Sequence, residues 1–171
     1  VQVVRLQQVH GGRVHLQGYA GRVALFTERV LPAVGDRVHA ERDEVMQRFR
    51  KKVELLVEGL NKIPGVKCLM PGGTFYAFPS VAKICNRLKI NSHGLAMFLL
   101  EGADDKLGVA CLGGECFGAA GGGFLRFSCA EPDDRLRQAL EFLASAFGRS
   151  DRAEKYLSEN PGYRLTEPYG E

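Results

Sequence analysis

The most informative part of the sequence is GGECFGAAGGGFLRFS, residues 113–128. Its first half is dense in glycine, which is typical of a loop rather than of a helix or a strand. Its second half alternates, so in a strand Phe124 and Arg126 share one face while Leu125 and Phe127 take the other. We therefore predict a strand over residues 123–129 that places one arginine among apolar neighbours.

Arg126 is the first candidate for a functional residue. Removing a guanidinium from water without a partner is costly, so an arginine among apolar neighbours needs a carboxylate close to it. The protein itself could supply that partner from Glu115, from Glu131 or from a helix C-terminus. A ligand could supply it equally well. The residues alone leave both alternatives open.

Two other kinds of site are poorly supported around this loop. The glycines lack the GxGxxG spacing before a helix and the GK[ST] ending of a P-loop, so we do not expect phosphate binding. Cys111 and Cys116 with His93 form only a loose version of a zinc pattern, because a zinc site favours paired ligands at short spacing. The chain has five cysteines, which we interpret as reduced, mostly buried thiols of a cytoplasmic protein.

Helices and strands are expected on both sides of this segment. Apolar residues at helical spacing predict one long helix over residues 36–61, which Pro64-Gly65 ends. Strands at 66–70 and 74–79, joined by a Pro-Gly-Gly turn, look like a β-hairpin. The remaining elements are expected as helices at 81–88, 92–101 and 133–147 and as a strand at 107–111. The sequence thus predicts an α+β fold, in which helices cover one face of a small antiparallel or mixed sheet and a long connecting helix comes first.

The two ends of the chain differ from this middle part. Residues 1–37 contain several glycines that weaken any assignment to one helix or strand, and we treat them as a divergent N-terminal segment. Residues 38–148 form the predicted domain. Residues 149–171 carry few large apolar side chains and include Pro161 and Pro168, so we expect a polar C-terminal tail that lies on the surface or frays.

Composition limits the classes of partner. The chain has 171 residues, a formal net charge of +3 and a pI of about 8.6, which is too weakly basic for a nucleic-acid-binding surface. No run of residues approaches the roughly 18 apolar residues that cross a bilayer, and the N-terminus does not look like a signal peptide. We expect a soluble, cytoplasmic protein with neither a nucleic-acid nor a membrane partner.

Four pieces of sequence, in this order, resemble one known family. They are LLVEGLNKIPG at residues 55–65, MPGGTFYAFP at residues 70–79, LGVA at residues 107–110, and the Gly118 loop that leads to Arg126. From about Val38 to Phe147 the chain looks like the C-terminal small domain of the class I/II pyridoxal-phosphate-dependent aminotransferases. This is the fold type I group that contains aspartate aminotransferase.

The resemblance implies roles for a few residues. In such enzymes the arginine that matches Arg126 forms a two-pronged ion pair with the α-carboxylate of the substrate, because its planar fork fits carboxylate geometry. The glycine that matches Gly73 sits where the small domain closes on the substrate, and a side chain there would crowd the site. Phe75 and Tyr76 are expected as hairpin and core residues rather than as substrate contacts.

The resemblance also implies what this chain lacks. In the family a Schiff-base lysine, an aspartate at the pyridinium nitrogen, a stacking aromatic ring and a phosphate cup all precede the small domain. None of the eight lysines of this chain has the sequence context of the catalytic lysine. We therefore expect no catalytic residue and no metal ligand here, and no pyridoxal phosphate bound by this chain alone.

Two functions remain in view. The first is a C-terminal fragment of an aminotransferase of amino acid metabolism, which supplies Arg126 and part of the active-site lid but is not competent alone. Its partners would be a complementing large domain or a second copy in a dimer, and its substrates an amino acid and a 2-oxo acid. The second is a non-catalytic binding or self-associating module, because an orphaned apolar helix face favours dimerisation. Which amino acid is used, and whether the chain counts as an enzyme, stay open.

Overall fold

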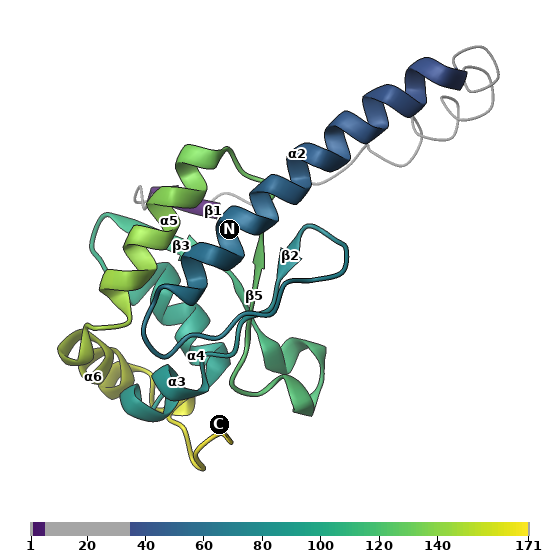
Figure 1. Ribbon diagram of the computed structural model, residues 1–171. Coiled ribbons are helices and arrows are strands. Elements are labelled where there is room, and N and C mark those ends of the chain that lie inside the picture. Colours follow the sequence, from purple (N-terminus) through teal and green to yellow (C-terminus); the bar gives the residue numbers. More distant parts are fainter. Residues whose placement is uncertain (1, 6–34, 171) are drawn as a thin grey trace, which may run out of the picture. The chain divides into compact units, whose positions relative to one another are not determined.

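The computed structural model describes residues 2–5 and 35–170, with side chains from residue 41 onward (Figure 1). The chain divides into two compact units, Val1–Leu6 with Phe49–Glu171, and Gln7–Arg48. The first unit contains the described strands, most of the helices and the hydrophobic core. Most of the segment expected to diverge, residues 1–37, lies outside the described residues.

Helix α2 (Gly35–Asn61) is the long helix predicted from the apolar spacing. Its C-terminal half buries Leu56 and Leu60 completely. The chain then turns at Gly65, whose φ of +88° is favoured by glycine alone. Asn61 fixes this turn, because its side-chain amide donates to and accepts from the backbone of Cys68 through two hydrogen bonds of 2.8 Å.

Two small antiparallel sheets form the β structure of the described residues. The strands β2 (Tyr76–Ala77), β5 (Leu125–Ser128) and β4 (Leu112–Gly113) lie in that order, with β5 in the centre. The second sheet pairs β1 (Gln2–Arg5) with β3 (Leu107–Ala110). Side chains along β5 alternate as predicted, since Leu125 and Phe127 are buried while Arg126 and Ser128 are half-buried on the other face.

The predicted β-hairpin over residues 66–79 is wrong. Strand β2 pairs with β5 instead, with Tyr76 opposite Ser128. The segment 66–70 keeps a single bridge, from Lys67 to Ser80, at the base of a wide loop. The physical reason is burial: Leu69 is 89% exposed and Met70 is 52% exposed, so a strand there would have no core to pack against.

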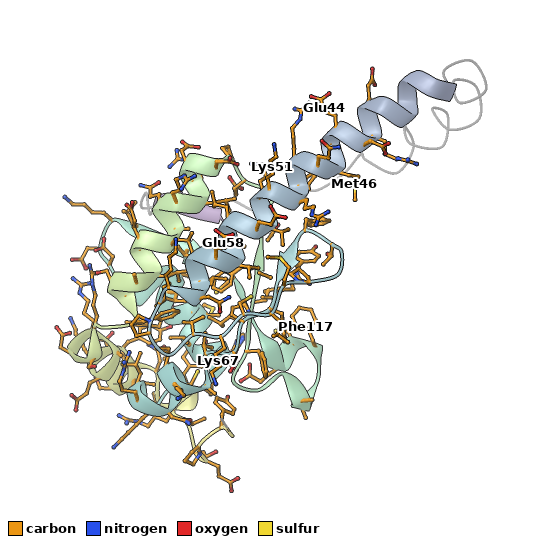
Figure 2. All side chains as sticks on the ribbon, viewed as in Figure 1. Glu44, Met46, Lys51, Glu58, Lys67 and Phe117 are labelled. Atoms are coloured by element: carbon orange, nitrogen blue, oxygen red, sulfur yellow. The ribbon has the colours of Figure 1, made fainter. Side chains whose placement is uncertain are left out.

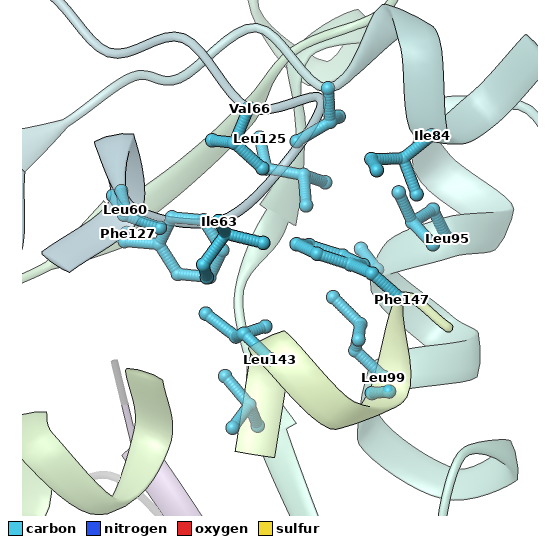
Figure 3. Packing of buried hydrophobic residues seen from close by; sticks show 14 of the residues in the cluster. Leu60, Ile63, Val66, Ile84, Leu95, Leu99, Leu125, Phe127, Leu143 and Phe147 are labelled. Atoms are coloured by element: carbon cyan, nitrogen blue, oxygen red, sulfur yellow. The ribbon is translucent and has the colours of Figure 1, made fainter. Parts of the chain in front are cut away.

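Helices cover one face of the three-stranded sheet. They are α3 (Ala82–Leu88), α4 (Ser92–Met97), which continues into a π-helical turn at Phe98–Gly102, and α5 (Asp133–Ala146). Asn91 caps α4, because its side chain accepts a hydrogen bond of 2.7 Å from the backbone N–H of Gly94. Figure 3 shows the resulting core, in which Leu125 and Phe127 meet apolar side chains of the helices.

The C-terminal residues are more ordered than the expected surface tail. Helix α6 (Ser150–Glu159) follows α5, and a 3-10 turn (Pro161–Tyr163) follows α6. Three residues of α6, namely Ala153, Tyr156 and Leu157, belong to the buried core. Their spacing of three and four positions is that of one helix face. The expectation of a frayed tail is therefore corrected, and the reason it failed is that one short apolar stripe in a polar helix gives a weak periodic signal.

The α+β fold predicted from the sequence is confirmed. A small antiparallel sheet carries helices on one face, and the long helix α2 precedes them in the chain. Within residues 2–5 and 35–170, no helix has both the length and the apolar character that a membrane crossing needs. The face of β5 opposite the core, which carries Arg126, is where a site can form.

Candidate functional site

Strand pairing fixes the surroundings of Arg126. Because β5 is the central strand, Arg126 has a strand on each side, with Leu112 of β4 directly opposite it. On the β2 side, Tyr76 lies opposite Ser128, which occupies the same face of β5 as Arg126. Side chains two positions apart on neighbouring strands are within reach of each other when they are long or aromatic. The register thus brings Tyr76 next to Arg126.

Two aromatic rings hold the guanidinium of Arg126. Its Cζ atom lies 4.4 Å from the centre of the Tyr76 ring and 4.6 Å from the centre of the Phe117 ring. Tyr76 comes from β2. Phe117, labelled in Figure 2, comes from a short 3-10 helix, Gly114–Phe117, in the glycine loop. Both distances are in the range of cation–π attraction, which favours the charged guanidinium and restricts its orientation. We call Tyr76, Phe117 and Arg126 the aromatic clip.

Neither candidate carboxylate from the sequence is paired with Arg126. Glu115 accepts hydrogen bonds from the hydroxyl groups of Ser92 and Tyr169 instead. Glu131 lines the same cavity as Arg126, but the two form no ion pair. Within the part of the chain that the structure describes, Arg126 has no carboxylate partner at all. The alternative in which the protein itself neutralises this arginine is therefore not realised there.

A cavity of about 310 Å³ opens beside Arg126. Its lining residues are Tyr76, Ala110, Cys111, Leu112, Arg126, Ser128 and Glu131. The volume is at the lower end of the roughly 300–1,000 Å³ that small-molecule sites occupy. Burial raises the pKa of the Cys111 thiol to about 12, so this cysteine is not a thiolate nucleophile at neutral pH. The chemistry that the cavity offers is therefore ion pairing and hydrogen bonding.

A larger cavity, of about 520 Å³, lies between α2 and α5. Its walls include Lys51 and Glu58 of α2, labelled in Figure 2, and Arg137 and Glu141 of α5. All four side chains are exposed, and charges of both signs are mixed along the walls. Such a groove is a solvated seam between two helices, so its size does not make it the better candidate.

The glycines before β5 allow the loop to cross itself closely. Gly114 and Gly121 face each other so tightly that a Cβ on either would overlap the carbonyl oxygen of the other. Gly118 has a φ of +118°, which glycine adopts readily and other residues do not. The backbone N–H of Gly114 donates to the carbonyl of Phe124 at 2.8 Å and closes the loop. The glycines therefore shape the turn that brings Phe117 to Arg126.

The second predicted site residue, Gly73, lies in the wide loop that precedes β2 and is exposed. No described atom lies within 4 Å of a Cβ built on Gly73, so the described residues contain nothing that a side chain there would crowd. Gly73 also does not line the cavity beside Arg126. That a side chain at position 73 would crowd the substrate site therefore stays a prediction. If it does so, the atoms that it crowds lie outside the described residues of this chain.

Sequence reasoning missed both rings of the aromatic clip. Tyr76 was expected in a hairpin or in the core, but its ring faces Arg126 and its neighbour Ala77 is the buried residue of β2. The sequence did contain a signal for Tyr76: successive side chains of a strand point to opposite faces, so a buried Ala77 places Tyr76 on the outer face. The sequence contained no such signal for Phe117, because its position depends on the close packing of Gly114 against Gly121 within the glycine loop. Phe75, also expected in the hairpin or the core, is 40% exposed.

The cavity does not fit pyridoxal phosphate. The cofactor is held as a Schiff base by a lysine, and the described residues that line the cavity include none. The described residues of the lining include a single arginine. They do not include the N-terminus of a long helix, where backbone N–H groups could bind a phosphate. The described lining residues therefore supply neither the lysine nor the phosphate cradle that the cofactor would need.

The cysteines agree with the interpretation as thiols. All five are free, and Cys68, Cys85 and Cys129 are buried while Cys111 is half-buried and Cys116 is exposed. Mostly buried thiols were predicted, and this is confirmed. Among the described residues, no group of three His, Cys, Asp or Glu side chains lies together as a metal site would require.

Comparison with known proteins identifies relatives of this chain. No protein-family model matches it. The aspartate/prephenate aminotransferase of Nitrosomonas europaea is 34% identical over 108 residues, which cover 59% of this chain and 26% of that protein. The chain thus spans about a quarter of the length of the curated relatives it matches.

Solved structures agree with the sequence relatives. The aromatic aminotransferase from Pyrococcus horikoshii has a TM-score of 0.53 and 27% identity, covering 74% of this chain and 29% of its own. The aspartate aminotransferase from Thermus thermophilus with maleate has a TM-score of 0.53 and 31% identity, covering 63% of this chain and 25% of its own. The resemblance stated from the sequence is thereby confirmed.

Proposed function

We propose that this chain, which resembles the C-terminal small domain of the pyridoxal-phosphate-dependent aspartate aminotransferases, binds the α-carboxylate of an amino-acid substrate through Arg126. The observation that supports the proposal most directly is the aromatic clip. It holds a half-buried guanidinium that has no carboxylate partner among the described residues, next to a cavity of about 310 Å³.

The geometry of a guanidinium explains why the clip suits a carboxylate. Aromatic rings attract a guanidinium through its flat face, while its N–H groups donate in the plane of the group. With Tyr76 and Phe117 against it, Arg126 keeps in-plane donors for a two-pronged bond to a carboxylate. A lysine would carry the same charge but not the planar fork, so it would bind the carboxylate less well.

The chain would not transfer an amino group alone. Transfer requires a lysine for the cofactor, and the described residues around the cavity provide none. A complementing large domain would supply the cofactor site, and the assembly would act on an amino acid and a 2-oxo acid in the cytoplasm. The exposed loop with Gly73 would then form part of the lid over that site.

A titration with maleate tests the carboxylate site, because maleate is the small dicarboxylate named with the solved Thermus relative. We expect saturable binding by the full chain, and an Arg126→Lys variant that binds roughly tenfold to a hundredfold more weakly because a charged two-pronged bond is lost. The control is Arg152→Lys, since Arg152 is already paired with Asp105. Equal affinities of the wild type and Arg126→Lys would remove Arg126 from the site.

Addition of pyridoxal phosphate tests the claim that the chain is not competent alone. We expect no stoichiometric Schiff-base absorbance with the purified full chain, because no lysine lines the cavity among the described residues. A stoichiometric band that borohydride fixes to one lysine would overturn this part of the proposal.

A second candidate, the self-associating module, is favoured by one observation. Phe78 is 40% exposed and Phe117 is 51% exposed, and the two rings meet edge to face 5.9 Å apart on the outer face of the sheet. Exposed apolar surface of this kind can mark an interface. Sedimentation velocity over a range of concentrations decides between the two: a dimer that Phe78→Ser abolishes supports the module, and a monomer that binds maleate supports the carboxylate site.

A further inference from the structure

We propose that Tyr169 is a positioning residue for the aromatic clip: with Glu115 and Ser92 it forms a C-terminal clasp that fixes the glycine loop and thereby the ring of Phe117 over Arg126. This inference deepens the proposed function and rests on it for its consequence in ligand binding. The clasp itself is a set of contacts that can be tested separately.

Hydrogen bonds join the three members of the clasp. The Tyr169 hydroxyl donates to Glu115 Oε1 at 2.8 Å and accepts from the backbone N–H of Ser92 at 3.2 Å. The Ser92 hydroxyl donates to the same Glu115 oxygen at 2.5 Å. Ser92 is fully buried, and the second oxygen of Glu115 is covered from solvent without a hydrogen-bond partner among the described residues. Among the described side chains, the two hydroxyl groups are therefore the hydrogen-bond donors to this carboxylate.

The ionisation of the two acids suits this arrangement. Burial acts to raise the pKa of Glu115, but hydrogen bonds from Ser92, from Tyr169 and from nearby backbone N–H groups outweigh it and lower that pKa. Burial also raises the pKa of Tyr169. Near neutral pH the clasp thus contains an ionised carboxylate as acceptor and a neutral phenol as donor, which is the combination that the geometry requires.

The ring of Tyr169 occupies space that two glycines leave open. A Cβ on Gly122 would come within 2.9 Å of the ring, and a Cβ on Gly123 within 3.1 Å of it. The Ser92 hydroxyl also accepts a hydrogen bond of 3.0 Å from the backbone N–H of Gly123. Gly122 and Gly123 therefore leave room for the Tyr169 ring, while Gly114 and Gly121 allow the two ends of the loop to pack closely.

The backbone of Tyr169 is anchored independently of its side chain. Asn86 of α3 accepts from the N–H of Tyr169 at 2.9 Å and donates to its carbonyl at 3.0 Å. Removal of the Tyr169 hydroxyl should therefore leave the C-terminal segment in place and disturb only the loop. This separation makes Tyr169→Phe an informative variant.

The clasp meets the clip at both ends of the loop. Glu115 and Phe117 belong to the same four-residue 3-10 helix, so a fixed Glu115 also fixes the base of Phe117. At the other end, Gly123 lies two residues before Leu125, the first residue of β5, and three residues before Arg126. A loosened clasp would let the Phe117 ring leave the guanidinium, while the buried strand would stay.

The test compares Tyr169→Phe with Tyr163→Phe in the full chain. Both variants lose one phenol hydroxyl in the C-terminal segment, but the Tyr163 ring packs against His93 and Tyr156 and takes no part in the clasp. Two readouts apply: hydrogen exchange of the Gly123 amide, and the NMR signal of Arg126 Nε–Hε, which senses the ring of Phe117. Circular dichroism checks that each variant is folded.

We expect Tyr169→Phe to speed exchange of the Gly123 amide roughly tenfold, the effect of one lost buried hydrogen bond, and to shift the Arg126 signal. Tyr163→Phe should change neither. Glu115→Gln, which keeps an acceptor oxygen, should give a smaller change than Glu115→Ala. If Tyr169→Phe leaves the exchange unchanged, or speeds it without moving the Arg126 signal, the positioning role is refuted.

Maleate affinity separates this inference from the proposed function. If the wild type binds maleate, Tyr169→Phe should weaken that binding severalfold while Tyr163→Phe does not. If the wild type does not bind maleate, the carboxylate site fails, and the clasp is still decided by the exchange rate and the Arg126 signal.

Discussion

The arginines at the N-terminal end of helix α6 and the arginine of strand β5 have different partners. Arg149, at the start of α6, donates to the carbonyl of Ala103 and to the Asp104 carboxylate at 2.9 Å. Arg152 forms a two-pronged pair with Asp105. Arg126 has only aromatic rings against it among the described residues. Arg149 and Arg152 thus have carboxylate partners from the chain, whereas Arg126 has none among the described residues.

The two regions also differ in how they bury apolar side chains. In α6, Leu157 is 2% exposed and belongs to the core, although the helix is polar in composition. Around Arg126, Leu112 is 42% exposed. The exposed fraction of a leucine side chain thus distinguishes the two regions: it is low in α6, which stabilises the fold, and high beside Arg126, where the chain presents a surface.

The largest expected effect comes from truncating a leucine in each region. Leu157→Ala should lower the free energy of unfolding by about 2–5 kcal/mol, because it leaves a cavity in the core. Leu112→Ala should cost about 1 kcal/mol or less, since much of that side chain is already in water. Urea denaturation measures both. If the two losses were equal, α6 would not be part of the core.

A smaller effect is expected when each arginine loses its charge. Arg149→Met should destabilise the protein by about 1.5–3 kcal/mol, because Asp104 and the Ala103 carbonyl lose a charged donor. Arg126→Met should cost less than about 1 kcal/mol, because methionine can still pack against both rings. Thermal unfolding followed by circular dichroism provides the comparison. A larger loss for Arg126→Met would mean that Arg126 has a structural partner.

The smallest effect is a dependence of stability on pH. Hydrogen bonds to Asp104 from the backbone N–H of Lys106 and then from Arg149 hold the pKa of this carboxyl at about 2. Since this pKa is below the unfolded value of about 3.9, the ionised form stabilises the folded state. That contribution is complete above about pH 4 and is lost as the pH falls towards 2.

Asp104→Asn isolates this contribution from those of other carboxyl groups. The asparagine oxygen can still accept the backbone hydrogen bonds, but the side chain no longer titrates. We expect the variant to show a shallower loss of stability between about pH 4 and pH 2 than the wild type, measured by urea denaturation at each pH. Parallel curves for the two proteins would contradict the assigned pKa.

Much of the fold could be predicted from local patterns. The helices α2 and α5 have long apolar stripes, and β5 alternates cleanly, so their positions and buried faces followed from periodicity. The hairpin was predicted wrongly because pairing depends on which strand lies nearby, and β2 has only two residues to specify it. Helix α6 was missed because three apolar residues in ten give a weak signal.

The site could be predicted only in part. Arg126 stood out because a charged residue interrupts an apolar strand, and the structure leaves it without a carboxylate among the described residues. Its ring partners and the clasp residue Tyr169 come from segments up to about fifty residues away in the sequence, and only the folded chain brings them together. Alternation against Ala77 could have indicated Tyr76, but the contacts of Phe117 and Tyr169 leave no periodic trace in one sequence.

The most direct test of the carboxylate site is an NMR titration of the full chain with maleate, followed at the arginine Nε–Hε signals. The Arg126 signal should lie away from ordinary arginine positions because of the rings of Tyr76 and Phe117, and it should move and saturate as maleate is added. The signals of Arg149 and Arg152 should stay in place, since both guanidinium groups are already paired. If the Arg126 signal moves no more than those two at saturating maleate, the site does not bind a carboxylate.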